Sequence, residues 1–262
     1  MVERVETGGG YRERNSTADR ALGILMLFDA DKPVWGSNEI AARLGVSRST
    51  SYRYLQSLIS TGFIEEAPGG FRLGPKIFEL ARMARIGLGL SEIALPIMRK
   101  LAAQANEAVL LTRRSGRSVV CLDLVEAHHI VRLSYERGHV LPINAGASAE
   151  VLLAWADPAE VSAVLAQAPL ERFTARTLTD PQALITRLAY IRKRGIALSQ
   201  GELDEHILGI AAPIRDATGS VCAAISIAAL ARRMPRSELT SAEVAVRTAA
   251  ASISRQLEIR DA

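Results

Sequence analysis

Residues 39–74 read EIAARLGVSRSTSYRYLQSLISTGFIEEAPGGFRLG, and this stretch decides the fold of the N-terminal part of the chain. Aliphatic residues at helical spacing predict a short helix over 38–44 capped by Ser37 and, after a tight turn, a longer helix over 47–60. Two short apolar runs on either side of a Pro-Gly-Gly turn predict a hairpin over 63–73. Helices followed by such a hairpin are typical of a winged helix-turn-helix.

The exposed side of the longer helix is predicted to carry hydroxyls, arginines and an amide. No carboxylate occurs between Ser47 and Phe63, and residues 37–62 hold three arginines against one glutamate. Such a surface suits the phosphates and base edges of a DNA major groove, with the hairpin arginine near the adjacent minor groove or phosphates. The residues predicted to bind DNA are Ser47, Arg48, Ser49, Ser51, Tyr52, Arg53, Gln56 and Arg72. The alternative is that helices and wing make contacts between proteins.

The bulk composition describes a chain of about two domains. Of the 262 residues, 48% are hydrophobic and 23% are charged, as in soluble globular proteins. The net charge of +4 does not by itself indicate nucleic acid, because residues 1–80 hold ten basic and ten acidic side chains and the excess falls in 81–262. No apolar run is long enough to span a bilayer, and no secretory signal is found. We therefore expect a cytoplasmic protein, without membrane partners, in which Cys121 and Cys222 are buried free thiols.

Outside the opening stretch the chain changes character. Residues 1–15 are expected to form a disordered arm, and the winged helix-turn-helix domain is expected over 16–74, with an apolar helix at its start. Residues 75–90 predict a linker helix. Residues 91–262 predict an α+β domain, a mostly antiparallel sheet flanked by helices. The expected elements are a helix capped by Ser91, two strands around a turn at 115–116, a strand within 128–144, helices over 149–156 and 158–166, a helix between Asp180 and Gly195, strands over 196–199, 209–215 and 221–228, and a last helix from a capping box at 240–243 to about 259.

Several segments together resemble the IclR family of bacterial transcriptional regulators, over nearly the whole chain from about residue 16. In the N-terminal part they are ADRALGILMLF, EIAARLGVSRSTSYRYLQSLISTGFIE and GGFRLGPKIFELA; later come GHVLPINAGASAEVLLAW, IRKRGIALSQGELDEHILGIAAPIRDATGSVCAAISIAAL and AASISRQLE. The resemblance implies a GAF-like effector-binding domain joined by the linker helix to the winged domain. It also implies a homodimer or dimer of dimers on double-stranded operator DNA, modulated by a small organic or aromatic acid. Where family members commonly carry a lysine before LLA, this chain has Glu150.

The resemblance further implies an effector pocket between the sheet and the helix that starts near residue 147. The residues implied to line it are Ala147, Ser148, Ser199, Ile207, Gly209, Ser226 and Ala228. Ser226 and Ala228 alternate with Ile225 and Ile227, so they share one face of a strand. Small side chains there leave room for a ligand, and the amides at the helix start suit a carboxylate. Tight sheet packing by serines and alanines is the alternative interpretation.

The sequence does not favour an enzyme. It contains no GxSxG, GxGxxG or P-loop motif, and no spacing of Ser, His and Asp indicates a triad. We therefore assign no catalytic residue and no cofactor. His206 beside Glu202, Asp204 and Glu205 could bind a cation, but a solvated acidic loop is the favoured interpretation, and no metal site is assigned. The alternative function is a small-molecule-binding protein whose winged helix serves dimerisation instead of DNA binding.

Overall fold

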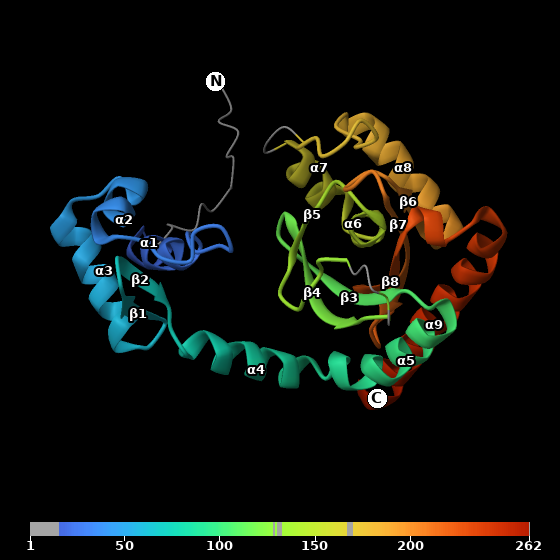
Figure 1. The fold of residues 1–262 in the computed structure, drawn as a ribbon, viewed down its shortest axis with the longest axis horizontal. Helices are drawn as coiled ribbons and strands as arrows, with labels where there is room; N and C mark the ends of the chain where they lie inside the picture. The colour runs from blue at the N-terminus through green and yellow to red at the C-terminus, as the bar shows by residue number, and fades with distance from the viewer. Residues whose placement is uncertain (1–15, 128, 130–132, 167–169, 262) are drawn as a thin grey trace, which may run out of the picture. The chain divides into compact units, whose positions relative to one another are not determined.

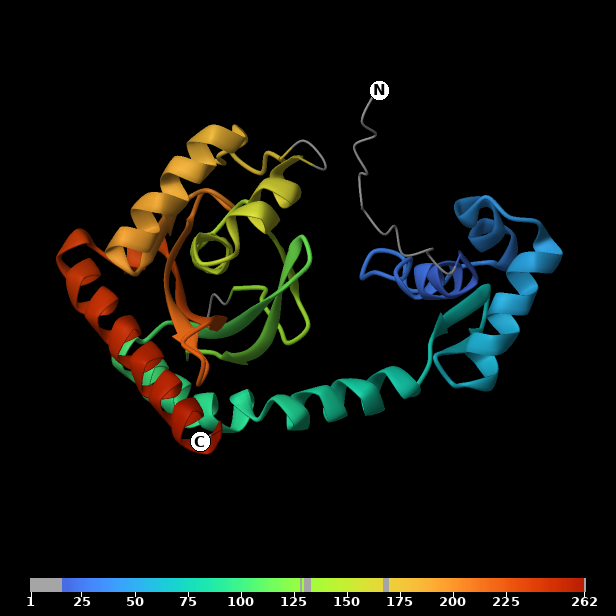
Figure 2. The ribbon, with the colours of Figure 1, turned by 180° about the vertical axis from the view of Figure 1, so that it is seen from behind.

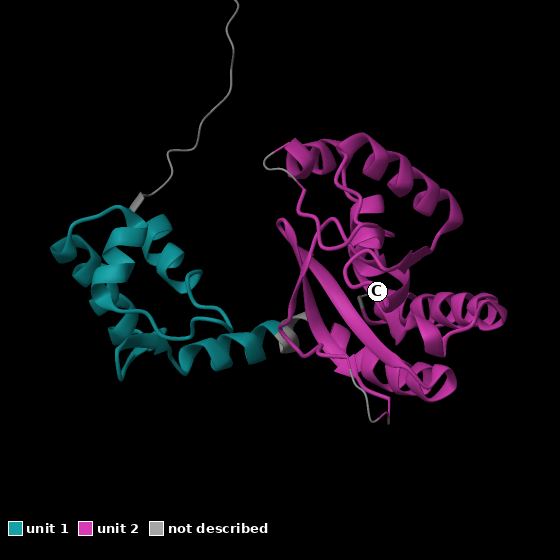
Figure 3. Cartoon of the chain, turned by 45° about the horizontal axis from the view of Figure 1, so that its top comes forward, with its two compact units in different colours: residues 1–87 teal, residues 88–262 magenta. Residues whose placement is uncertain are grey.

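The chain divides into two units, residues 1–87 and 88–262 (Figure 3). The computed structural model describes residues 16–127, 129, 133–166 and 170–261, so the arm expected over 1–15 lies outside the described residues. Each unit has a hydrophobic core of its own, as independently packed domains do.

The first unit is a winged helix-turn-helix, as predicted. Its buried core is formed by Ile24, Ile40, Leu55, Leu58 and Ile64, which come from the three helices and the hairpin and therefore hold all of these elements together. The two strands pair antiparallel. The elements, blue to cyan in Figure 1, are α1 (Ser16–Leu25), α2 (Ser37–Leu44), α3 (Arg48–Ser60), β1 (Ile64–Ala67) and β2 (Gly70–Leu73).

The start of α2 differs from the prediction by one residue. Gly36, instead of Ser37, occupies the N-cap position, and the Glu39 carboxylate accepts a hydrogen bond from the Gly36 amide at 2.9 Å. The helix ends where Gly45 takes a left-handed conformation, with φ of 64°. The turn between α2 and α3 therefore has the sharp geometry that the glycine predicted.

Helix α4 (Lys76–Leu88) follows the hairpin and contains the boundary between the units. The Lys76 amide donates to the Gly62 carbonyl at 3.1 Å, which ties the start of α4 to the end of α3. Phe78, Leu80 and Met83 are 78%, 48% and 51% exposed. These three side chains leave an unusually large apolar surface exposed on α4.

The second unit is built on a six-stranded antiparallel sheet in the order β5-β4-β3-β8-β7-β6. Helices α5 and α9 cover one face, and α6, α7 and α8 lie on the other (Figures 1 and 2). Along β8, Ile225 and Ile227 face α5 and α9, whereas Ser226 and Ala228 face α6, as the alternation predicted. The elements are α5 (Leu90–Ala105), β3 (Ala108–Ser115), β4 (Ser118–Val125), β5 (Val140–Pro142), α6 (Ala147–Ala154), α7 (Pro158–Ala166), α8 (Pro181–Arg194), β6 (Ala197–Gln200), β7 (Ile207–Arg215), β8 (Val221–Leu230), a 3-10 turn (Ala231–Arg233) and α9 (Arg236–Asp261).

The start of α9 corrects a prediction. The helix begins at Arg236, directly after Pro235, and so includes the stretch over 240–243 that was predicted to cap it. Glu243, expected as the carboxylate of a capping box, lies inside the helix and pairs with Arg194 at 2.7 Å. Its carboxylate links α9 to the end of α8.

Smaller differences affect other element ends. Gly89, instead of Ser91, is the N-cap of α5, and α6 begins at Ala147, two residues earlier than expected. Of the strand expected within 128–144 the structure assigns β5, while residues 128 and 130–132 lie outside the described residues. None of these differences changes the predicted α+β architecture.

Candidate nucleic-acid interface and effector pocket

The cap of α3 organises the candidate DNA-binding surface. Ser47 Oγ accepts a hydrogen bond from the Thr50 amide at 3.2 Å and lies 3.0 Å from Ser49 Oγ. This satisfies one of the first-turn amides that have no acceptor inside a helix. The predicted residues that lie exposed at the cap and along the helix are Ser47, Arg48, Ser49, Tyr52, Arg53 and Gln56. The structure therefore gathers six of the eight predicted residues on one polar surface of α3.

Arg48 and Arg53 carry the positive charge of this surface. Among the described residues, neither guanidinium has an ion-pair partner within 4.0 Å. No acidic side chain occurs anywhere in α3. Both arginines can therefore meet phosphate oxygens without first breaking a bond to a carboxylate.

Ser51 corrects the predicted surface. It is 1% exposed, and among the described residues its hydroxyl has no hydrogen-bond partner. The reason is helical spacing, because Ser51 precedes Leu55 and Leu58 by four and seven residues and therefore shares their buried side. Its hydroxyl cannot reach a ligand at the surface, so the assignment of Ser51 to the exposed side is wrong.

The eighth predicted residue, Arg72, lies on the hairpin and is already paired. Its guanidinium donates to Glu65 Oε1 at 2.6 Å, directly across the two strands. Both side chains are exposed, so such a pair contributes roughly 0–1 kcal/mol and can exchange for a phosphate. The hairpin is fixed to the domain through Trp35, whose backbone pairs with Phe71. A Cβ on Gly70 would lie 2.2 Å from the Trp35 carbonyl oxygen, so only glycine fits there.

A small cavity of about 50 Å³ lies between the start of α6 and the sheet. Its lining contains all seven residues implied by the resemblance: Ala147, Ser148, Ser199, Ile207, Gly209, Ser226 and Ala228. The structure adds Tyr135, Leu110, Leu141 and Leu203, which no pattern in the sequence singled out. Among the described residues, those that line the cavity carry no charged side chain.

The polar groups of the cavity come from the start of α6 and from β8. Ser148 Oγ donates to Ser226 Oγ at 2.9 Å, and both serines are buried. Gly146, with φ of 94°, sets the start of α6, whose first amides have no acceptor inside the helix. Positive electrostatic potential at this helix end favours a carboxylate over a cation.

Gly209 allows α6 to approach the sheet closely. A Cβ at this position would lie 3.2 Å from Ala147 Cβ and 3.7 Å from the Ala147 amide nitrogen. The glycine therefore sets the width of the cavity beside the helix start. The cavity is far smaller than the ~300–1,000 Å³ usual for ligand pockets, so a ligand must displace side chains or shift α6 to enter.

A partly buried ion cluster joins the elements that line this cavity. Arg187 Nε donates to Glu150 Oε1 at 3.0 Å, and the same guanidinium donates to the Leu198 carbonyl and lies 3.9 Å from Glu202 Oε1. Arg187 thus joins α6, β6 and the loop before β7, and each of these contributes residues to the cavity lining. Burial, followed by the negative charge of Glu202, raises the pKa of Glu150 to about 7 against the opposing effect of Arg187.

The remaining candidates do not assemble into a site. Within the described part of the chain, no group of three His, Cys, Asp or Glu side chains could hold a metal ion. The His206 amide donates to Asp204 Oδ1 at 2.8 Å, as in an ordinary polar turn. Cys121 is buried, as expected, whereas Cys222 is only half-buried and its thiol lies 3.6 Å from the Ile214 carbonyl oxygen. Within the same described residues, no helix has the length and apolar character needed to cross a membrane.

Comparison with known proteins establishes the family. Residues 17–68 match the IclR helix-turn-helix domain, and residues 85–255 match the C-terminal domain of the bacterial transcriptional regulator IclR. The chain belongs to the IclR family. The relatives of this IclR chain include the HTH-type transcriptional regulator BhcR of Paracoccus denitrificans (strain Pd 1222), 35% identical over 95% of this chain and 88% of BhcR. KipR of Bacillus subtilis (strain 168) is 30% identical over 94% of this chain and 98% of KipR.

Solved IclR structures share the fold. A putative IclR regulator from Silicibacter sp. TM1040 aligns with a TM-score of 0.85 and 28% identity, over 92% of this chain and 96% of that one. An IclR homologue from Microbacterium hydrocarbonoxydans, complexed with 4-hydroxybenzoate, aligns with a TM-score of 0.77 and 28% identity, over 93% and 99%. The predicted winged helix-turn-helix and GAF-like effector-binding architecture is confirmed. The IclR protein described here is a DNA-binding transcriptional regulator with a C-terminal ligand-binding domain, and the alternative of a winged helix used only for dimerisation is not favoured.

Proposed function

We propose that this IclR regulator reads double-stranded operator DNA with the exposed side of α3 and releases or retains it in response to a small acid. The DNA-binding domain is residues 16–74, the linker helix 75–90 and the effector-binding domain 91–262. The proposed DNA contacts are Ser47, Arg48, Ser49, Tyr52, Arg53 and Gln56 on α3, with Arg72 on the hairpin. The observation that carries the proposal is the acid-free α3 surface, whose two arginines are neutralised by no carboxylate in the part of the chain that the structure describes.

The protein is proposed to act in the cytoplasm as a homodimer or a dimer of dimers. Two recognition helices read two half-sites, which raises both affinity and specificity. Exposed apolar side chains on α1, directly after it and on α4 support a contact between DNA-binding domains: Leu22 is 60%, Met26 83% and Phe78 78% exposed. Burial of these side chains between two copies removes apolar surface from water.

The effector is proposed to be a small organic or aromatic acid that binds in the cavity beside α6. Its carboxylate would accept hydrogen bonds from the first amides of α6 and from Ser148 or Ser226, while Leu110, Leu141 and Tyr135 contact its carbon skeleton. The neutral lining supports this assignment, because a helix end can hold an anion without a cationic side chain. The 4-hydroxybenzoate bound by the Microbacterium hydrocarbonoxydans homologue is an acid of this class.

Removal of the two α3 arginines tests the DNA interface. We expect Arg48→Ala and Arg53→Ala each to weaken binding to a duplex selected by the protein from a random library. Each lost phosphate contact should reduce the slope of log affinity against log salt by about 0.9, as followed by fluorescence anisotropy. Arg255→Ala, an exposed arginine on α9, is the matched control and should leave affinity and slope unchanged. Unchanged DNA binding in the double α3 variant would exclude the proposed surface.

Ligand-induced stabilisation tests the pocket. A ligand at a hundred times its Kd should raise the free energy of unfolding by ~2.7 kcal/mol, so a thermal-shift panel of glyoxylate, pyruvate, protocatechuate and 4-hydroxybenzoate will show which acid class binds. Gly209→Ala places a methyl group against Ala147 and should reduce the affinity for the acid about tenfold or more. Gly23→Ala in α1 is the control, because its methyl group meets only an ordinary contact at 3.7 Å and should leave the affinity for the acid unchanged. An acid that binds both variants equally well does not occupy this cavity.

A further inference from the structure

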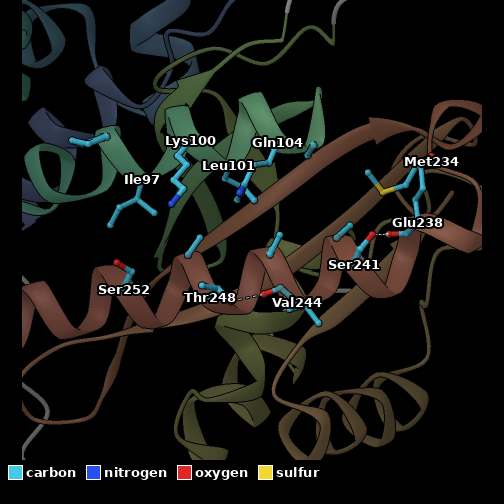
Figure 4. A pocket seen from close by; sticks show the side chains of 15 residues that line it. Ile97, Lys100, Leu101, Gln104, Met234, Glu238, Ser241, Val244, Thr248 and Ser252 are labelled. Atoms are coloured by element: carbon cyan, nitrogen blue, oxygen red, sulfur yellow. Dashed lines mark hydrogen bonds between the residues drawn. The ribbon is translucent and has the colours of Figure 1, made fainter.

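A groove of about 700 Å³ lies between α9 and the end of β7. Its lining includes three arginines, Arg215 at the end of the strand and Arg247 and Arg255 on the helix. Val244 and Thr248 lie on another side of α9 and line a separate groove beside α5 (Figure 4). Within the described residues, this arginine groove shares no lining residue with the effector cavity.

Arg247 is held against the end of α8. Its Nη2 donates a hydrogen bond to the Arg194 carbonyl oxygen at 2.6 Å. Gly195 follows with φ of 71°, and a Cβ there would lie 2.9 Å from Arg247 Nη1, so the glycine leaves space for the guanidinium. The bond to the carbonyl uses one of five N–H groups, and a ligand can accept from the others.

Arg215 is fixed by the turn between β7 and β8 and by α9. Its Nη1 donates to the Gly219 carbonyl oxygen at 2.8 Å, and its guanidinium carbon lies 5.6 Å from the centre of the Trp155 ring. The Arg215 amide donates to Ser254 Oγ of α9 at 2.9 Å, which ties the strand end to the helix. Two of the three guanidinium groups are therefore placed in advance, and this reduces the entropy lost when a ligand binds.

The positive charges of the arginine groove have no internal counter-ion. Among the described residues, none of the three guanidinium groups has a carboxylate within 4.0 Å. The lining contains two acids, but Asp216 Oδ1 accepts from the Thr218 hydroxyl and amide at 2.6 Å and 2.9 Å, so its charge is taken up within the turn. Glu258, the other acid, is exposed and opposes a bound anion.

The spacing along α9 indicates the shape of the ligand. Arg247 and Arg255 are eight residues apart, which is roughly 12 Å along the helix. Ala250 and Ala251 lie between them and form a floor of small side chains. Arg215 belongs to the Arg255 end, where β7 is bonded to α9. The groove therefore has guanidinium groups at both ends of an open floor.

We propose that the arginine groove binds a small organic anion with two separated phosphate groups, one near Arg247 and one beside Arg215 and Arg255. The planar fork of a guanidinium donates two parallel hydrogen bonds to a phosphate, which suits arginine better than lysine. Two phosphate groups engage both ends at once, and the second contact is then intramolecular. The regulator would thus have two small-molecule sites of different character, a neutral cavity for an acid and a cationic groove for a bisphosphate.

Binding of three model anions tests the ligand class. Fructose 1,6-bisphosphate, tripolyphosphate and orthophosphate are titrated into the full chain by calorimetry at one ionic strength, because salt screens such contacts. We expect the bisphosphate to bind about tenfold or more tightly than either of the others, since it alone carries two separated phosphate groups. Equal affinity for all three would indicate an adventitious ion only, and preference for tripolyphosphate would indicate a compact site. Either result, or no binding of the bisphosphate, would overturn the proposal.

Substitutions in both directions test the location. Arg255 is exposed, so Arg255→Gln should keep the thermal stability of the parent while it weakens bisphosphate binding about fivefold or more. Arg247→Lys keeps the charge and a donor for the Arg194 carbonyl but loses the fork, and we expect a loss of about the same size. Glu258→Gln removes the opposing charge and should strengthen binding about threefold. Arginines with only a structural role would give no such gain, so an unchanged affinity in Glu258→Gln and Arg255→Gln would overturn the proposal.

Two controls exclude other arginine surfaces and other anions. The Arg48→Ala/Arg53→Ala variant of the proposed DNA surface should bind the bisphosphate as the parent does, and a loss of binding there would place the anion on α3 instead. Arg255→Gln should leave the affinity for operator DNA unchanged, whereas a reduced affinity would show that the groove binds the DNA backbone. Both contrary results would overturn the proposal. No acid effector is present in these titrations, so they succeed or fail independently of the effector cavity.

Discussion

At the scale of single residues, Glu150 is the carboxyl group whose environment has the clearest consequence. It is 1% exposed, and burial with the neighbouring Glu202 charge raises its pKa to about 7. The folded protein therefore binds this proton more tightly than the unfolded chain does. Stability gained from that proton is complete below about pH 4.5 and is lost as the pH rises through about 7.

Glu150→Gln removes this titration and keeps the shape of the side chain, but it retains only one of the two oxygens that accept from Arg187. We expect the parent protein to lose roughly 1–3 kcal/mol between pH 5 and pH 8 relative to the variant, because each unit of pKa shift is worth about 1.4 kcal/mol. The free energy of unfolding from urea titrations at several pH values measures the difference. Glu160→Gln, at an exposed carboxylate on α7, is the control and should follow the parent. A parent and a Glu150→Gln curve with the same pH dependence would contradict the raised pKa.

Some residue roles could be predicted and others could not. The buried position of Ser51 follows from the phase that Leu55 and Leu58 define, but a serine beside arginines was interpreted by its polarity instead of by its spacing. The Glu150–Arg187 pair joins residues 37 positions apart, so no local pattern contains it. The alternation at Ser226 and Ala228 is a local property of one strand, and for that reason it was predicted correctly.

At the scale of elements, helix ends were predictable where their signals are local and unopposed. Asp180, Pro181 and Gly195 bound α8 as expected, and Asp180 Oδ2 accepts from the Ala183 amide at 2.7 Å. The start of α9 had two competing local signals, Pro235 and the capping box at 240–243. The helix begins directly after Pro235. Met234, which precedes this proline, is buried in the domain core, and this long-range contact cannot be read from the local sequence.

The same local physics makes the Ser47 cap of α3 testable. Ser47→Ala removes the acceptor for the Thr50 amide, which should cost about 1 kcal/mol and speed exchange of the first-turn amide hydrogens about fivefold. Ser49→Ala is the control, because its hydroxyl contacts Ser47 Oγ and, among the described residues, no backbone amide. Hydrogen exchange followed by mass spectrometry of peptides from α3 measures both variants. Equal exchange in the two would show that the cap contributes nothing.

At the scale of the whole molecule, the regulator has two kinds of binding site on units with separate cores. The protein populates more than one conformational state. Binding of the effector changes the affinity for DNA only if the effector and the DNA each bind these states with different affinities. Thermodynamic linkage then fixes the size of the effect in both directions, whatever path joins α4 to the effector-binding domain.

We therefore expect the effector to change operator affinity by a factor of about 5–150, and saturating operator to change effector affinity by the same factor. Fluorescence anisotropy of labelled operator and calorimetric titration of effector, at one salt concentration, measure the two factors. The Arg48→Ala/Arg53→Ala variant is the control, since it keeps the cavity and should bind effector with an affinity that DNA no longer alters. An acid that binds in the cavity but changes neither operator affinity nor its own affinity in the presence of operator is a ligand that does not regulate DNA binding. A ligand with equal affinity for the conformational states of the protein cannot shift the equilibrium between them.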